Sequence, residues 1–396
     1  MSAPVPFAAK ANVALLALCQ ALSMTSTNVI MVVTGLVGLS LAPDKSMATV
    51  PLGLQFTAMM LSTLPSAFVM KRFGRRAGFT AGSATGVVGA AIATWAILEA
   101  SFLGFAVASF IIGFANGVAQ LYRFAAADAA PERFRSRAIS LVMAGGIVSA
   151  SFGPEFAKWS RDLLAPVMFA GCFLVVGVLH ACAIVVQRFL RIPPPSQAER
   201  RDQGRPLSQI ARQPTFIVAV LGGMIGYAVM SLVMTSTPIA MAACNLPFED
   251  SAFVIQWHAL GMYVPAFFTG HLIHRFGVIN VMLAGIALNV ACIGINIAGL
   301  DLINFWTGLL LLGVGWNFVF VGATTLLTRT HTAAERAKVQ SFNDFLVFGL
   351  VTVASFSSGA LLQNLGWEAV NIGVAPLLIA VLAAVLWLRA RQPALA

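Results

Sequence analysis

The chain has 396 residues, of which 59% are hydrophobic and only 10% are charged. A soluble protein of this length would carry roughly 25% charged residues, so the composition excludes an ordinary soluble domain. The net charge of +10 could indicate a nucleic-acid partner, but the cations lie in short segments between long apolar runs. Membrane topology explains that distribution better, so we expect a lipid bilayer and no nucleic acid around this chain.

The first half, residues 1–187, contains six apolar runs that are long enough to cross a bilayer as helices. Their approximate ranges are 11–41, 47–70, 77–98, 102–125, 138–156 and 166–187. The first run is too long for the core of a signal peptide, so we interpret it as a membrane span. Its polar face could hydrogen-bond to neighbouring helices or line a cavity. The residues of this face are Gln20, Ser23, Thr27 and Thr34.

The fourth run carries a second polar face. Steps of four and three residues place Asn116, Gln120 and Arg123 on the same side of a helix. Arg123 could instead extend its guanidinium to the membrane surface while its stem stays in the apolar region.

A polar, proline-rich linker at residues 188–214 separates the two halves and is too short to fold as a domain. Residues 215–396 then contain six further apolar runs. Their approximate ranges are 215–243, 251–272, 278–298, 303–328, 339–362 and 367–388. The chain is therefore predicted to be an all-α integral membrane protein with twelve transmembrane helices.

Two short motifs recur about 200 residues apart, in the same order in each half. The first is Arg72-Phe73-Gly74, which returns as Arg275-Phe276-Gly277. The second is Ala-Pro-Glu-Arg-Phe-Arg at residues 130–135, which returns as Ala-Ala-Glu-Arg-Ala-Lys at residues 333–338. We interpret the chain as two homologous six-helix bundles with pseudo-symmetry, the organisation expected of a transporter.

The distribution of positive charge predicts the orientation of these spans. Twelve spans place both termini on one side, and that side receives 21 of the 24 lysines and arginines. The opposite loops hold only Lys45, Lys158 and Arg161. Because cytoplasmic segments are enriched in Lys and Arg, we expect both termini and the linker to be cytoplasmic.

The two repeats, the central linker and the basic loop after the second span together resemble the major facilitator superfamily. The family signature at this loop reads Gly-x-x-x-Asp-Arg-x-Gly-Arg-Arg. This chain matches it at Arg72, Gly74, Arg75 and Arg76, whereas Ala67 replaces the first glycine and Lys71 replaces the aspartate. The second copy keeps Arg275 and Gly277 but has His274 at the acidic position.

The resemblance implies that this loop is a gate latch that pairs with charges at neighbouring span ends. Asp128, Glu132 and Glu335 are the possible partners, and Lys71 requires part of that network to be rewired. An arginine of the fourth span that the family often uses in proton coupling would fall near Ser109 or Gly113, so it is missing. The glycine-proline motif of drug/proton antiporters is only partly present in the fifth span. Both departures argue against a standard proton-driven drug exporter.

Residues 313–328 and 340–345 resemble a proteobacterial subgroup of the family that includes riboflavin importers. The candidate substrate-binding residues are polar or aromatic groups within the spans, most of them amides. They are Gln20, Thr27, Asn116, Gln120, Arg123, Gln256, Trp257, Trp316, Asn317, Asn343 and Asp344. This set suits a neutral, flat, polar molecule that stacks on indole and hydrogen-bonds to amides. The two tryptophans could instead pack or anchor, and Asp344 could lie at the membrane interface.

No lysine follows a glycine, so the phosphate-binding loop of an ATP pump is absent. The five cysteines show no paired spacing, and we expect no metal, disulfide or cofactor. We therefore expect a monomeric secondary transporter of a bacterial inner membrane that imports riboflavin. Multidrug or metabolite efflux is the alternative, because these residues do not encode a direction. A membrane-embedded enzyme would need more than the His271-x-x-His274 spacing, and nothing in the sequence supports a sensor.

Overall fold

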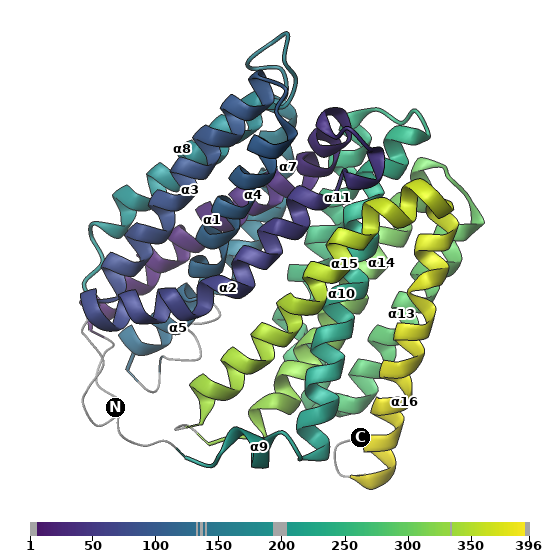
Figure 1. Ribbon diagram of the computed structural model, residues 1–396. Coiled ribbons are helices and arrows are strands. Elements are labelled where there is room, and N and C mark those ends of the chain that lie inside the picture. The colour runs from purple at the N-terminus through teal and green to yellow at the C-terminus, as the bar shows by residue number, and fades with distance from the viewer. Residues whose placement is uncertain are drawn as a thin grey trace. The chain divides into compact units, whose positions relative to one another are not determined.

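The computed structural model describes residues 6–131, 134, 138, 141–192, 204–332 and 335–392. Within these ranges all regular secondary structure is helical, as the apolar runs predict (Figure 1). The chain forms two compact units. The first consists of Met1–Pro43 and Leu54–Pro195, and the second of Asp44–Gly53 and Ser196–Ala396.

The first unit is a bundle built around α1, which packs against α7, α8, α5 and α4. Small residues on α3 allow neighbouring helices to approach closely. A methyl group added at Gly82 would lie 2.6 Å from the side chain of Val118, and one at Gly86 would lie 2.5 Å from the ring of His180. The helices are α1 (Phe7–Leu41), α2 (Val50–Phe73), α3 (Arg75–Leu98), α4 (Phe102–Ala119), α5 (Tyr122–Ala129), α7 (Gly145–Ser160) and α8 (Ala170–Gln187).

The second unit is organised around α10, which packs against α14, α15 and α16, while α13 packs against α14. Its helices are α9 (Leu207–Ile210), α10 (Pro214–Ala243), α11 (Phe248–Tyr263), α12 (Ala266–Phe276), α13 (Val278–Ala298), α14 (Leu302–Thr328), α15 (Arg336–Gly373) and α16 (Ala375–Arg391). The short η1 helix (Lys45–Met47) and the residues after it up to Gly53, which include the first turn of α2, also belong to this unit. They are held on α15 by a 2.9 Å hydrogen bond from the Gly359 amide to Thr49 Oγ1.

Eight helical segments of the described chain are long and apolar enough to cross a membrane. One of them, Lys338–Arg391, is 54 residues long and contains two spans, because Gly366 interrupts the helical backbone with a φ of 83°. The remaining spans of the predicted twelve correspond to α2, α7 and the α11–α12 pair, which Pro265 divides. The fourth span is also broken, since α4 ends at Ala119 and α5 begins at Tyr122.

Candidate functional site

Four aromatic side chains from three helices of the second unit meet in one cluster, which we call the aromatic corner. Trp316 and Phe320 are one helical turn apart on α14, and their rings stack with centroids 4.8 Å apart and planes at 12°. Tyr227 of α10 meets both rings edge-on, at 5.4 and 5.7 Å. Phe348 of α15 approaches Tyr227 at 6.0 Å. Such edge-to-face contacts stabilise aromatic pairs beyond the area that they bury.

The aromatic corner combines an apolar surface with one buried indole N–H group that has no hydrogen-bond partner. Trp316 is only 7% exposed, yet its indole Nε1 has no hydrogen-bond partner within the protein. Tyr227 is partly exposed. Buried indole N–H groups usually find an acceptor, which makes this donor a candidate contact for a bound molecule.

A polar side chain lies one turn from the aromatic corner. A methyl group at Gly223, four residues before Tyr227, would lie 3.9 Å from Asn343 Oδ1. Asn343 therefore faces α10 from α15, and its amide donates a 3.2 Å hydrogen bond to Asp344 Oδ1. Of the predicted substrate-binding residues, Trp316 and Asn343 thus meet in one region, with Asp344 beside them.

The structure gives two other predicted residues of the second unit a different environment. Asn317 is 2% exposed, and both ends of its amide are engaged within the protein. It accepts a 2.7 Å bond from Thr269 Oγ1 and donates a 2.6 Å bond to the Met262 carbonyl. Gln256 is partly buried on α11. We therefore assign Asn317 to the packing of α14 against α11 and α12, away from the candidate site.

Trp257 lies in a second aromatic cluster near the start of α14. Its ring meets Trp306 edge-on at 5.8 Å and Phe253 at 6.2 Å, and it is 37% exposed. Partly exposed tryptophan and phenylalanine side chains near a span end are typical of the aromatic belt at a membrane interface. We therefore do not assign Trp257 to the candidate substrate site.

The first unit contains buried amides whose polar atoms have no partner within the protein. Gln20 on α1 is 4% exposed with a free Oε1, and Asn116 on α4 is 3% exposed with both amide atoms free. Gln55 on α2, which the candidate set did not include, is 0% exposed and has both amide atoms free. An unsatisfied buried polar group costs about 1–3 kcal/mol, so these amides are candidates for contact with a polar ligand.

Three further candidates of the first unit lie at less buried positions. Thr27 uses its hydroxyl in a 3.0 Å bond to the Ser23 carbonyl of its own helix. Gln120 sits at the break between α4 and α5. Arg123 follows the break and places its guanidinium 4.8 Å from the ring centroid of Phe124. A cation over an aromatic face is stabilised there.

The two basic loops predicted to form the gate latch have the same local geometry. Gly74 and Gly277 both have a positive φ, of 87° and 83°, and each is the single residue between two consecutive helices. Arg72 lies 5.3 Å from the ring centroid of Phe73, and Arg275 lies 5.3 Å from that of Phe276. Arg75 is partly buried and Arg76 is exposed.

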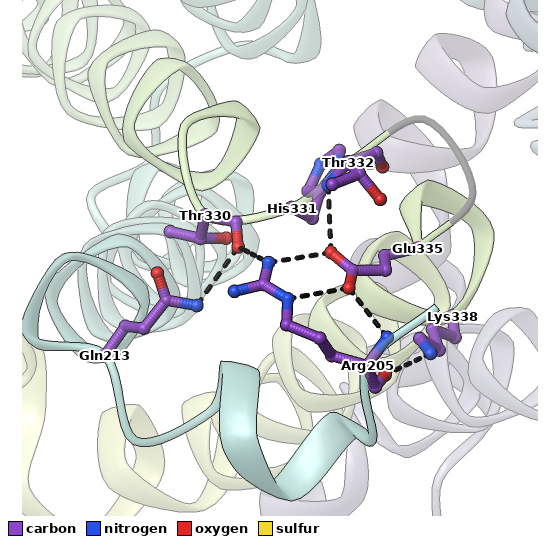
Figure 2. Close-up of polar contacts among 7 residues, drawn as sticks. All are labelled: Arg205, Gln213, Thr330, His331, Thr332, Glu335 and Lys338. Atoms are coloured by element: carbon purple, nitrogen blue, oxygen red, sulfur yellow. Dashed lines mark hydrogen bonds and ion pairs between the residues drawn. The ribbon is translucent and has the colours of Figure 1, made fainter. Parts of the chain in front are cut away.

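Of the three carboxylates predicted as partners of these loops, the structure describes the side chain of Glu335 only. Glu335 forms an ion pair with Arg205 of the linker, with 2.7 Å between Arg205 Nε and Glu335 Oε1 (Figure 2). Hydrogen bonds from Arg205 and from the Thr332 amide hold the pKa of Glu335 well below its usual range. The side chains of Asp128 and Lys71, and the whole of Glu132, lie outside the described residues.

Long apolar helices in both units, partnerless buried amides in the first unit and the aromatic corner in the second are the arrangement expected of a multi-pass membrane transporter. The model of the Major Facilitator Superfamily matches residues 16–350, and the chain belongs to this family. It is therefore a secondary transporter of the membrane and not an enzyme.

The relatives agree with this assignment. The chain is 43% identical over 377 residues to the riboflavin transporter RfnT of Brucella anthropi, with 95% of both chains covered. It is 27% identical to the MFS-type transporter YddS of Bacillus subtilis, with 89% of this chain and 85% of that protein covered.

Solved structures show the same fold. The D-xylose–proton symporter matches with a TM-score of 0.75 at 14% identity, over 95% of this chain and 97% of the symporter. The human organic anion transporter MFSD10 matches with a TM-score of 0.67 at 15% identity, over 95% and 99% of the two chains.

The sequence reasoning missed Tyr227, Phe320 and Phe348. Phenylalanines within an apolar run carry the same pattern as ordinary core residues, so no signal separated them. Tyr227 did carry a signal, because it is one of only three tyrosines in the chain and lies inside a span.

Proposed function

We propose that this protein transports riboflavin. The observation that carries the proposal is the aromatic corner, which offers ring surfaces to a flat molecule. The choice of riboflavin as that molecule is supported by the relative named as a riboflavin transporter, which is 43% identical over nearly the full length. Riboflavin has a planar ring system for stacking and a hydroxylated tail for hydrogen bonds. The free indole Nε1 of Trp316 and the amide of Asn343 are suited to the polar edge of such a ring.

The proposed direction is uptake across a bacterial inner membrane, with both termini on the cytoplasmic side and a monomeric protein. The cation bias of the predicted loops supports the orientation. The domains are proposed as residues 1–187 and 215–396, joined by a linker at 188–214. Transport would occur by alternating access, for which the basic loops at Gly74 and Gly277 form the latch and Gln20 and Asn116 remain ligand candidates of the first unit.

Growth of a riboflavin auxotroph tests this proposal. Cells that express the protein should grow on low external riboflavin, and Trp316→Ala should abolish that growth at equal membrane abundance. Trp257→Ala is the matched control, because it removes an indole from the second aromatic cluster and should retain growth.

The alternative function is efflux of a planar drug or metabolite, since the aromatic corner would also accept other flat molecules. A well-expressed protein that fails to rescue the auxotroph, and that lowers the accumulation of a fluorescent drug in the same cells, would replace riboflavin uptake by efflux.

A further inference from the structure

The linker ends in a buried polar contact with the second unit (Figure 2). Glu335 is 1% exposed, and its carboxylate accepts bonds from the Arg205 amide at 2.8 Å, from Arg205 Nη2 at 2.8 Å and from the Thr332 amide at 2.9 Å. A fourth bond comes from Arg205 Nε at 2.7 Å. A planar guanidinium that binds both carboxylate oxygens is among the strongest polar contacts in proteins.

The same arginine also reaches the end of a second helix. Arg205 Nη2 donates a 3.0 Å bond to the carbonyl of Thr330, directly after α14. Gln213, which precedes α10, donates a 3.1 Å bond to the same carbonyl. Lys338, in the first turn of α15, donates to the Arg205 carbonyl. These contacts connect the end of α14 with the starts of α15 and α10, and we call them the linker clasp.

The backbone before Arg205 is fitted to this contact. Gly204 has a φ of 53°, and a methyl group there would lie 2.5 Å from Cγ of Glu335. A side chain at this position would therefore meet both a strained backbone and a clash. After Arg205, the linker forms α9, whose Ile210 is fully buried. The segment from Gly204 to Gln213 is thus packed as part of the second unit.

The helices joined by the linker clasp are the three that carry the aromatic corner. With a rise of about 1.5 Å per residue, the clasp lies roughly 15 Å from Phe320 along α14 and roughly 20 Å from Tyr227 and Phe348 along their helices. A tilt of about 5° at the clasp would displace a ring 20 Å away by about 1.7 Å. Misplacement of about 1 Å can disrupt a site that depends on alignment.

We infer that Arg205 and Glu335 are positioning residues for the substrate site, because they fix the ends of α10, α14 and α15 relative to one another. The inference rests on the proposed function in so far as the aromatic corner binds the substrate. It assigns the linker a role in substrate affinity, beyond that of a tether between the two halves.

The first test measures riboflavin uptake by Arg205→Ala, Glu335→Gln and Gly204→Ala at equal membrane abundance. The apparent KM should rise about three- to tenfold, while the maximal rate changes less than about twofold, because the clasp acts on the geometry of the corner. Arg212→Ala is the matched control, since Arg212 is exposed seven residues further along, and it should keep the wild-type KM. An unchanged KM in all three clasp variants overturns the inference.

The second test needs no substrate. Ile210→Cys reports on the clasp and Phe348→Cys on the aromatic corner, because both positions are buried. Adding Arg205→Ala should speed maleimide labelling about tenfold at residue 210 and severalfold at residue 348, measured by peptide mass spectrometry on the full-length protein in liposomes. Labelling of Ser208→Cys, which is already exposed, should not change.

These readouts separate the two proposals. Faster labelling at residues 210 and 348, in a protein that does not carry riboflavin, refutes the proposed function and retains the positioning role. An unchanged rate at residue 348 overturns the positioning role, whatever the protein transports.

Discussion

Gly74 and Gly277 adopt the same backbone conformation, with φ and ψ of 87° and 160° in the first and 83° and 151° in the second. This region of conformational space is accessible essentially only to glycine. In both loops the glycine amide donates a 3.0 Å bond to the carbonyl four residues earlier, Met70 or Ile273. The internal repeat noticed in the sequence is therefore also a repeat of local structure.

Replacing Gly74 by valine should reduce riboflavin uptake strongly, because a valine in this backbone conformation would strain the proposed latch by about 1–3 kcal/mol. Gly277→Val meets the same strain but should reduce uptake less. The reason is that Arg75 and Arg76 follow Gly74, whereas Val278 and Ile279 follow Gly277. Initial uptake rates at equal membrane abundance measure the difference. Gly294→Ala, with nothing within 4 Å of the added methyl group, controls for loss of a glycine. Full activity in both valine variants would remove the loops from the mechanism.

Tyr227→Ala should raise the apparent KM for riboflavin about tenfold, since stacking of a heterocyclic base on an aromatic side chain contributes about 1–3 kcal/mol. Tyr227→Phe keeps the ring and its edge-on contact with Trp316, so its KM should stay within about threefold of the wild type. Uptake measured over a range of riboflavin concentrations gives both values. Equal defects in the two variants would mean that the hydroxyl, and not the ring, is what matters at this position.

The helical class, the spans and the glycine turns follow from the sequence because each depends on local chemistry. A run of about twenty apolar residues must be a helix in a bilayer, and a glycine between basic residues predicts a turn. The environment of each tryptophan does not follow, because it depends on which helix lies opposite. Trp316 meets Tyr227 of α10, whereas Trp257 meets Trp306 near a span end. The break at Pro265 was also not predicted.

The amides show the same limit. Asn317 and Asn343 are the same residue type, so the sequence does not distinguish them. In the structure the amide of Asn317 is hydrogen-bonded to Thr269 and to the Met262 carbonyl, whereas Asn343 faces α10 beside the aromatic corner. Only the packing of α14 against α11 and α12 distinguishes a structural amide from a candidate ligand. Gln55 illustrates the converse, since the sequence did not single it out and it is buried with both amide atoms free.

Asn317→Ala should lower the thermal stability of the purified protein, because the Met262 carbonyl loses the amide that donates to it, while the Thr269 hydroxyl keeps only its bond to the Pro265 carbonyl. The expected loss is about 1–3 kcal/mol for a buried hydrogen-bonding group. Asn343→Ala is the control, since its side chain is only partly buried and bonds to its neighbour Asp344. Melting curves in detergent compare the two. If Asn343→Ala is the more destabilised protein, the assignment of the two amides is reversed.

The pH dependence of the linker clasp follows from the lowered pKa of Glu335. A carboxylate with a depressed folded-state pKa contributes its stabilisation above the unfolded value, about 4.3, and loses it only as the pH falls toward the lower folded value. The clasp should therefore hold unchanged between about pH 5 and 8. Labelling of Ile210→Cys should show the same protection across this range after correction for maleimide chemistry. A loss of protection near pH 6 would show that the ion pair with Arg205 does not control the clasp.

The orientation predicted from the charge distribution can be tested with two exposed positions. Ser208 lies in the linker segment, and Asp301 lies in the loop between α13 and α14, on the opposite side in the twelve-span topology. Because the linker side receives 21 of the 24 lysines and arginines, Ser208→Cys should react with a membrane-impermeant maleimide only in inside-out vesicles. Asp301→Cys should react in intact cells. Labelling of position 208 from outside intact cells would invert the topology, and the proposed latch and linker clasp would then lie on the outer face.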